Sequence, residues 1–258
     1  MQQKRSFCDL NCDLGESFGA YAMGNDEAIM PYISSANIAC GFHAGDPLVM
    51  AKTIQLALQH GVGIGAHPGF PDLAGFGRRN MQMSPAELHA AILYQAGALK
   101  SMTEALGGRL QHVKPHGALY NAAAVNFEIA KTIAEAVKKL DGSLILVCPA
   151  HSEMERAAKS VGLSVTFEVF ADRAYNDDGT LVSRNIPGAV IHDPAELNER
   201  ILRFIKEQVV VSVSGKVIPI QADTICIHGD NSMALQFVQS LSVVFKKEGV
   251  IFKTMGTR

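Results

Sequence analysis

The sequence predicts an α/β protein built as an irregular (β/α) barrel of about seven parallel strands. Strand-like and helix-like segments alternate along all 258 residues, which is the pattern of a parallel sheet covered by helices. The strand-like segments are mostly apolar, as expected of strands buried on both faces. Turns that carry polar side chains follow several strands, and we call these turns polar corners. A closed or nearly closed barrel brings all such corners to one face. An open sheet would spread them along its edge.

Seven apolar segments account for the barrel strands, since each is short and is followed by a turn signal and a helical pattern. In chain order they are residues 6–11, 37–40, 62–66, 110–113, 144–147, 164–169 and 224–227. Residues 209–213 and 216–220 alternate in polarity around Ser214-Gly215 and predict a β-hairpin beside the main sheet. Residues 250–252 are expected to form a last short strand.

The helices between the strands begin and end at recognisable capping residues. Asp46 and Pro47 have the form of an N-cap and a first turn, and Gly61 ends that helix. Ser84-Pro85-Ala86-Glu87 has the form of a capping box and begins a helix that reaches about residue 106. The other helical segments lie near residues 26–33, 126–140, 151–161, 196–207 and 231–248.

The composition suits one large domain over residues 1–258. Hydrophobic residues make up 48% of the chain and charged residues 19%, so the chain can bury a sizeable core. The net charge of -2 gives no sign of a basic surface, so we expect no nucleic-acid partner. No apolar run approaches the roughly 20 residues of a membrane span. Five cysteines without a CxxC motif indicate reduced thiols and a cytoplasmic location.

A histidine lies close to a glycine at the end of four predicted strands. These histidines are His43, His67, His116 and His228, and the remaining five histidines are assigned to the surface or to packing. A fifth corner, residues 9–16, has carboxylates in place of the histidine. Because strand ends converge in a barrel, we expect these side chains to form one site assembled from several loops.

The carboxylates of these corners have two interpretations. Asp9, Asn11 and Asp13 share one face of a strand, because side chains alternate along it, and that face points into the barrel or over its mouth. Buried carboxylates are costly unless they are paired or bind a metal. Asp9 and Asp13 can instead cap loop amides. Asp46 is similarly ambiguous, since it can orient the His43 imidazole or cap the following helix.

Cationic side chains at the predicted strand ends indicate an anionic or carbonyl-bearing ligand. Lys114 follows the fourth strand directly. Arg173 and Arg184, in the long loop after the sixth strand, are suited to clamp a carboxylate or a phosphate. The alternative is a salt bridge with Glu168 or Asp172 that orders the loop.

One aspartate and two histidines from separate strands would form a facial site for a divalent metal, and Asp13, His67 and His116 are the best candidates. The same groups can serve as general acid and base without a metal. The His228-Gly229-Asp230 corner adds a further imidazole and carboxylate. No GxxxxGK[ST] or GxGxxG motif occurs, so a nucleotide would bind through loops of another type. No GxSxG nucleophile elbow is present either.

The sequence resembles the LamB/YcsF family in six segments that occur in the same order, and the resemblance covers nearly the whole chain. The segments are residues 9–16, 34–46, 66–72, 112–120, 168–175 and 228–230. The resemblance implies a TIM-barrel-like fold of the glycoside hydrolase/deacetylase type. It also implies that ATP is consumed to open the lactam of 5-oxo-L-proline to L-glutamate, together with two partner subunits, B and C.

Under this resemblance the strand-end residues receive roles in lactam hydrolysis. The candidate catalytic residues are Asp13, His43, Asp46, His67, Lys114, His116 and His228. The candidate substrate-binding residues are Asn11, Glu16, Arg173, Tyr175, Arg184 and Asp230. ATP is the expected co-substrate, with Mg²⁺ entering as Mg-ATP. Two alternatives stay open: a metal-dependent deacetylase of N-acetylated carbohydrate, and a non-catalytic subunit that presents the substrate to its partners.

Overall fold

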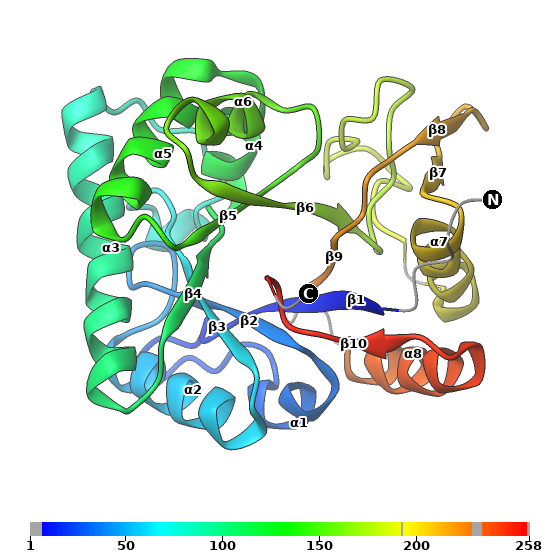
Figure 1. Cartoon of the computed structure of the whole chain (residues 1–258), viewed down its shortest axis with the longest axis horizontal. Helices are drawn as coiled ribbons and strands as arrows, with labels where there is room; N and C mark the ends of the chain where they lie inside the picture. The colour runs from blue at the N-terminus through cyan, green and yellow to red at the C-terminus, as the bar shows by residue number, and fades with distance from the viewer. Residues whose placement is uncertain (1–6, 192, 229–233, 257–258) are drawn as a thin grey trace.

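A computed structural model describes residues 7–191, 193–228 and 234–256 of the chain. Its main sheet contains β1 (Phe7–Leu14), β2 (Ser35–Ala39), β3 (Gly63–His67), β4 (Leu110–Val113), β5 (Ile145–Cys148), β6 (Ser164–Phe170) and β9 (Thr224–His228). These strands run parallel in that order, and β9 pairs with β1 to close the ring (Figure 1). The predicted (β/α) barrel is therefore confirmed, and each predicted segment overlaps one strand of the ring.

Two smaller strand pairings accompany the ring. The short strand β10 (Ile251–Phe252) pairs with the start of β1. The strands β7 (Val209–Val211) and β8 (Val217–Pro219) form the predicted antiparallel hairpin as a separate sheet, each somewhat shorter than expected.

Helices cover the outer side of the ring (Figure 1). They are α1 (Asp26–Ile29), α2 (Pro47–His60), α3 (Pro85–Ala105), α4 (Gly117–Val125), α5 (Phe127–Leu140), α6 (Glu153–Ser160), α7 (Pro194–Lys206) and α8 (Ala234–Glu248). The short 3₁₀ turns are η1 (Met30–Tyr32) and η2 (Leu73–Gly75). The Ser84 and Glu87 capping box is present at the start of α3, as predicted. No helix in the described ranges is both long and apolar enough to cross a bilayer.

The helix predicted near residues 126–140 is confirmed as α5, but the helix α4 that precedes it between β4 and β5 was not predicted. The sequence of α4 is apolar and alanine-rich, with few polar positions to mark a helical face, so periodicity does not reveal it. Asn126 separates the two helices, since its side chain accepts hydrogen bonds from the first amides of α5. The consequence for function is that α4 begins immediately after His116.

The interior of the barrel is polar, and the prediction that Asp9, Asn11 and Asp13 share a face is confirmed. The Asp9 carboxylate accepts hydrogen bonds from the hydroxyls of Ser34, Ser35 and Thr224. Closer to the carboxyl ends of the strands, Asn37 Nδ2 donates to Asn11 Oδ1 at 2.6 Å and to Asp13 Oδ1 at 2.9 Å. A chain of hydrogen bonds therefore runs inside the barrel along β1 toward the carboxyl ends of the strands.

The five cysteines are buried, and none of them forms a disulfide bond. Burial raises the pKa of the Cys226 thiol well above its usual value, so this group is neutral. Its sulfur nevertheless lies 3.0 Å from Lys114 Nζ, which places a cysteine in the polar interior.

We expect the ionisation of Asp9 to lower the stability of the fold as the pH rises. Burial raises the pKa of Asp9 from 3.8 to about 6, so the folded chain keeps a proton that the unfolded chain has lost. This contribution to stability is complete below pH 3.8 and is lost as the pH rises through about 6. A shift of this size changes the free energy of unfolding by about 3 kcal/mol.

Urea denaturation of wild type and Asp9→Asn at about pH 4 and pH 7 measures this contribution. Relative to wild type, the variant should gain about 2.4 kcal/mol in unfolding free energy between the two pH values, because asparagine does not ionise and a small part of the contribution is already lost at pH 4. Glu199→Gln, at an exposed carboxylate on α7, serves as the control. Parallel pH profiles for wild type and Asp9→Asn would contradict the prediction.

Candidate functional site

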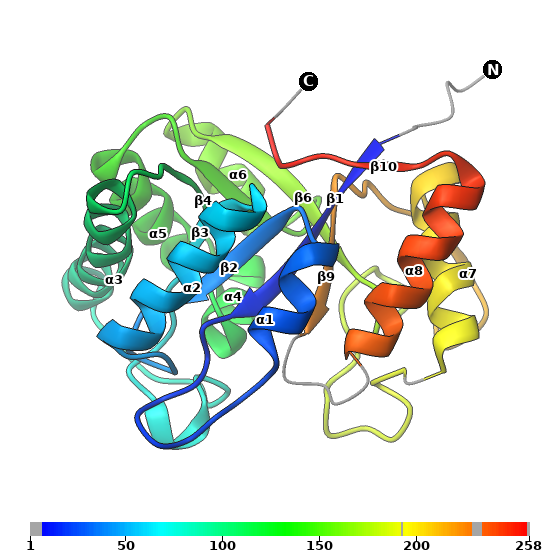
Figure 2. The same ribbon diagram turned by 90° about the horizontal axis from the view of Figure 1, so that it is seen from below.

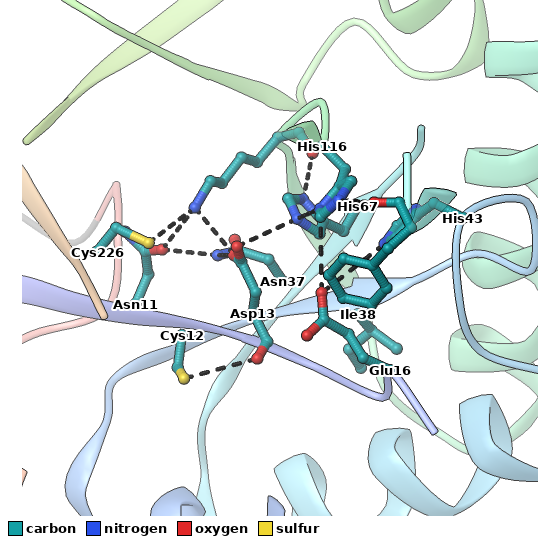
Figure 3. A network of polar contacts seen from close by, with 12 residues as sticks. Asn11, Cys12, Asp13, Glu16, Asn37, Ile38, His43, His67, His116 and Cys226 are labelled. Carbon is teal, nitrogen blue, oxygen red and sulfur yellow. Dashed lines mark hydrogen bonds and ion pairs between the residues drawn. The ribbon is translucent and has the colours of Figure 1, made fainter. Parts of the chain in front are cut away.

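The carboxyl ends of the barrel strands carry the polar side chains that the sequence predicts to converge. The loops after β1 and β3 lie at the same end of the molecule as the loop after β6 (Figure 2). At this end Asp13, Glu16, His43, His67 and His116 lie close together (Figure 3). The prediction of one site built from several strand ends therefore agrees with the arrangement of the described residues.

Lys114 is the centre of a buried ionic network beside these groups. Its ammonium lies 2.9 Å from Asp13 Oδ1 and 2.8 Å from Glu168 Oε1, and the residue is only 2% exposed. Burial alone would lower the pKa of Lys114, but the adjacent Asp13 and Glu168 carboxylates raise it well above its usual value. The lysine is therefore charged, and it fixes the position of Asp13.

Neutral side chains complete the surroundings of the lysine. Asn11 Oδ1 lies 3.3 Å from Lys114 Nζ, while Asn11 Nδ2 donates to Thr224 Oγ1 at 2.7 Å. His112 lies deeper, with Nε2 2.8 Å from Asn37 Oδ1, and burial lowers its pKa to about 3. His112, which the sequence assigned to the surface or to packing, is therefore a buried part of this hydrogen-bond network. Asn11, a predicted substrate contact, is fully buried beneath the site and uses its amide within this network.

Three imidazoles pack against one another above the network. The rings of His43 and His116 are stacked, with centroids 3.7 Å apart and planes 2° from parallel. The His67 ring stands at 89° to both of them. Burial and the neighbouring imidazoles lower the pKa values of His43 and His116 well below the usual range. Both rings are therefore neutral in this arrangement.

The hydrogen bonds of the three imidazoles differ. His67 Nδ1 lies 2.7 Å from the carbonyl oxygen of Lys114, and His116 Nε2 lies 2.9 Å from the carbonyl oxygen of Phe76. The second nitrogens of these two rings, His67 Nε2 and His116 Nδ1, are 2.9 Å apart. In contrast, neither nitrogen of His43 has a hydrogen-bond partner among the described residues, although the side chain is fully buried.

Carboxylates approach the imidazoles from β1 and from the turn that follows it. Asp13 Oδ2 lies 3.3 Å from His67 Nε2. Glu16 Oε1 lies 3.8 Å from His43 Nε2 and 3.9 Å from His116 Nδ1. Gly15 makes this approach possible, because its φ of +69° suits glycine and its amide donates to Asp26 Oδ2 at 2.9 Å.

The loop between β3 and α3 covers the imidazoles. Its Asp72 carboxylate accepts hydrogen bonds from the Gly75 amide and from the Arg79 guanidinium, which holds the loop in shape. The Phe76 ring packs edge-on against His116, with centroids 5.2 Å apart. The amide of Ala118, in the first turn of α4, donates to the carbonyl of Gly77 at 2.9 Å. The loop after β3 therefore covers the site: Asp72 holds the loop in shape, and the Gly77 carbonyl fastens it to the start of α4.

Asp46 occupies the capping position that the sequence left as one of two interpretations. Its carboxylate accepts from the amides of Leu48 and Val49 at the start of α2, and from the amide of Gly19 at 2.8 Å. Among the described residues, the Asp46 carboxylate makes no contact with His43. The structure therefore places Asp46 at the edge of the site, where it connects the loop after β1 to α2.

Two of the predicted substrate-binding residues in the loop after β6 are buried. Arg173 Nη2 donates to the carbonyl of Val182 at 2.5 Å, and burial together with the nearby Arg184 lowers the pKa of Arg173 to about 10. The Tyr175 hydroxyl accepts from the Phe170 amide at 2.9 Å. Arg184 lies on the exposed part of the same loop. These contacts assign Arg173 and Tyr175 to holding the loop.

The last predicted corner lies partly outside the described residues. The backbone of His228 is the end of β9 and pairs with Asp13, which brings it to the site. Its side chain and the whole of Asp230 fall outside what the structure describes.

Sequence reasoning missed two buried members of the site. Asn37 bridges Asn11, Asp13 and His112 from β2. Glu168 was considered only as a partner of an arginine, whereas it pairs with Lys114. A polar residue inside an apolar strand is the signal that marks both positions, because such a group needs a partner in the interior.

Comparison with known proteins places the chain in a family. The sequence matches the model of the LamB/YcsF family over residues 8–258. A Clostridium beijerinckii protein, named as the A subunit of 5-oxoprolinase, is 54% identical over 242 residues, which span 94% of this chain and 95% of that protein. The crystal structure of a lactam utilization protein from Thermus thermophilus has a TM-score of 0.92 and 46% identity, over 96% of this chain and 99% of the other.

A more distant likeness concerns the fold alone. The catalytic domain of a peptidoglycan N-acetylglucosamine deacetylase from Eubacterium rectale has a TM-score of 0.52 at 10% identity, over 100% of this chain and 91% of that chain. The predicted relationship to deacetylase-type barrels is therefore confirmed at the level of the fold.

We expect Gly77→Ala to disturb the imidazole stack. A Cβ atom at Gly77 would lie 2.7 Å from His116 Cδ2 and 2.8 Å from His43 Cβ, and the backbone φ is +62°. The backbone strain should cost about 1 kcal/mol, and the collision should cost about 1–3 kcal/mol more in unfolding free energy. The ring NMR signals of His43 and His116 should shift as well.

Gly179→Ala is a matched control for this substitution. Its φ is +84°, but a Cβ there meets no atom within 4 Å, so only the backbone strain applies. Chemical denaturation and imidazole NMR compare the two variants. Equal losses of stability, with unchanged imidazole signals in both, would show that Gly77 is not shaping the site.

Proposed function

Because the chain belongs to the LamB/YcsF family, we propose that it works within an ATP-dependent 5-oxoprolinase and opens the lactam ring of 5-oxo-L-proline to L-glutamate. The observation that carries this proposal is a relative, 54% identical over 94% of this chain, that is named as the A subunit of 5-oxoprolinase. The lactam utilization protein at 46% identity supports it. The buried imidazoles and carboxylates at the barrel mouth supply suitable chemistry.

Opening a lactam requires proton transfer at two neighbouring atoms. Water must lose a proton as it adds to the carbonyl carbon, and the ring nitrogen must gain one to leave as an amine. A lactam amide is a poor electrophile, so we propose that the amide oxygen is first phosphorylated by ATP, with release of ADP. One water then opens the ring to an acyl phosphate, and a second releases phosphate and glutamate.

We assign the proton transfers to His43. The ring is buried, and its nitrogens have no hydrogen-bond partner among the described residues, so the unprotonated nitrogen is available to accept a proton from water. The same ring can then deliver that proton to the lactam nitrogen. His67 and His116 pack against His43, and Asp13 lies beside His67, so we assign these three side chains to shaping the space around the reacting amide. The loop over the stack excludes bulk water while the activated amide is present.

Cationic residues have separate assignments in this proposal. Lys114 is enclosed by Asp13, Glu168, Asn11 and Cys226, so it positions Asp13 and does not reach the ligand. Arg173 is engaged in the interior of its loop. We therefore assign the substrate carboxylate to Arg184, which lies on the exposed part of that loop and can form a bidentate pair.

The relatives are named as one lettered component of an enzyme, which implies a complex of several different chains. We propose partner subunits B and C for this chain, with ATP as co-substrate, Mg²⁺ bound to the nucleotide, and a cytoplasmic location. The deacetylase alternative rests only on a fold likeness at 10% identity. The non-catalytic alternative is an outcome of the experiment below.

His43→Gln should reduce ATP-coupled glutamate formation by the reconstituted three-subunit complex by about 100-fold or more, because the group that transfers the proton is lost. His60→Ala, at an exposed histidine at the end of α2, should retain wild-type turnover. Glutamate and ADP are measured together. Copurification of the three subunits checks that each variant still assembles.

Several outcomes would count against this proposal. Wild-type turnover in His43→Gln would remove the residue from the mechanism. If calorimetry then showed that the isolated chain binds 5-oxoproline, the chain would be a component that presents substrate. Failure of the wild-type chain to copurify with subunits B and C would exclude the proposed complex.

A further inference from the structure

Backbone carbonyls determine which nitrogens of His67 and His116 carry a proton. A carbonyl oxygen only accepts hydrogen bonds, so the nitrogen facing it must be an N–H group. His67 Nδ1 faces the Lys114 carbonyl at 2.7 Å, and His116 Nε2 faces the Phe76 carbonyl at 2.9 Å. In the neutral form of each ring, the remaining nitrogen therefore presents a lone pair.

These two lone-pair nitrogens lie close to each other. His67 Nε2 and His116 Nδ1 are 2.9 Å apart, in rings that are 1% and 5% exposed (Figure 3). Two buried lone pairs at this distance repel unless a positive centre lies between or beside them. That centre is either an additional proton, which would make one ring an imidazolium, or a metal ion.

The arrangement around the pair is that of a metal site. Imidazole ligands of metals usually donate their other N–H to a backbone carbonyl or a carboxylate, as both rings do here. Two ligands held about 2.0–2.1 Å from a tetrahedral ion are about 3.3 Å apart. Asp13 Oδ2 and His67 Nε2 are separated by 3.3 Å, and His67 and His116 need to move apart by only a few tenths of an ångström.

The charges nearby also suit a cation. Asp13, Glu16 and Glu168 are buried carboxylates, and Lys114 is the buried ammonium that faces two of them. Glu16 Oε1 lies 3.9 Å from His116 Nδ1, within reach of an ion bound to that nitrogen. Buried carboxylates are stabilised when they coordinate a metal.

The stacking of His43 excludes it from the same coordination sphere. A lone pair of imidazole lies in the plane of its ring, so an ion bound by His116 lies in the His116 plane. The His43 ring is parallel to that plane, with centroids 3.7 Å apart. The ion would therefore lie outside the plane of His43, which leaves His43 to act on a ligand.

We propose that His67 Nε2 and His116 Nδ1, with the carboxylates of Asp13 and Glu16, bind one divalent first-row transition-metal ion of the zinc type. Mixed imidazole and carboxylate ligands favour such ions, whereas Mg²⁺ prefers oxygen ligands alone. This site is distinct from any Mg²⁺ bound to a nucleotide. The proposal does not depend on lactam chemistry, so its test uses the isolated chain.

The chain is stripped with chelator and titrated with Zn²⁺ by calorimetry and with Co²⁺ by visible absorption. Wild type should bind one ion per chain, and the Co²⁺ spectrum should show coordination by nitrogen. His116→Gln should weaken binding at least about 100-fold, because a direct ligand is lost. His60→Ala, at an exposed histidine, should bind as wild type does. Absence of binding by the folded wild-type chain would overturn the proposal.

Imidazole ¹⁵N NMR keeps the test decisive if His116→Gln does not fold. In the wild-type chain, Zn²⁺ should move the signals of His67 Nε2 and His116 Nδ1 and leave both carbonyl-bonded N–H groups in place. If the signals instead show a protonated His67 Nε2 or His116 Nδ1 that Zn²⁺ does not displace, a proton occupies the position and the metal proposal is wrong.

Discussion

The ammonium of Lys114, enclosed between two carboxylates inside the barrel, is the interaction on which the candidate site depends. It lies 2.9 Å from Asp13 Oδ1 and 2.8 Å from Glu168 Oε1 with almost no exposure to solvent. A buried charge that loses its partner destabilises a protein strongly, because it is left without either water or a counter-ion. The three groups must therefore be present together, and together they fix Asp13 against His67.

This constraint explains why the site cannot form from any local segment. Asp13 comes from β1, His67 from β3, Lys114 from the end of β4 and Glu168 from β6. These strands are brought together only when the ring closes. The polar interior extends from the site down to Asp9, so the barrel core itself carries groups that need exact partners. Part of the stability that an apolar core would provide is replaced here by preorganised polar contacts.

Much of the fold and part of the site could be predicted from the sequence. Short apolar strands and clear helix caps marked the barrel, and histidines at strand ends marked where the site lies. The helix α4 was missed because its apolar sequence has no polar face. Glu168 and Asn37 were not assigned to the site, since pairing across the barrel depends on register rather than on sequence distance. Asp46 and Tyr175 look like site residues in sequence, yet their contacts are with backbone amides.

A double-mutant cycle on the free energy of unfolding tests the role of Lys114 most directly. Lys114→Met should cost about 3–5 kcal/mol, because Asp13 and Glu168 are left as uncompensated buried charges. Adding Glu168→Gln to that variant should restore part of the loss, since one of those charges is removed. A small cost for Lys114→Met, or a double variant whose loss equals the sum of the two single losses, would contradict the account.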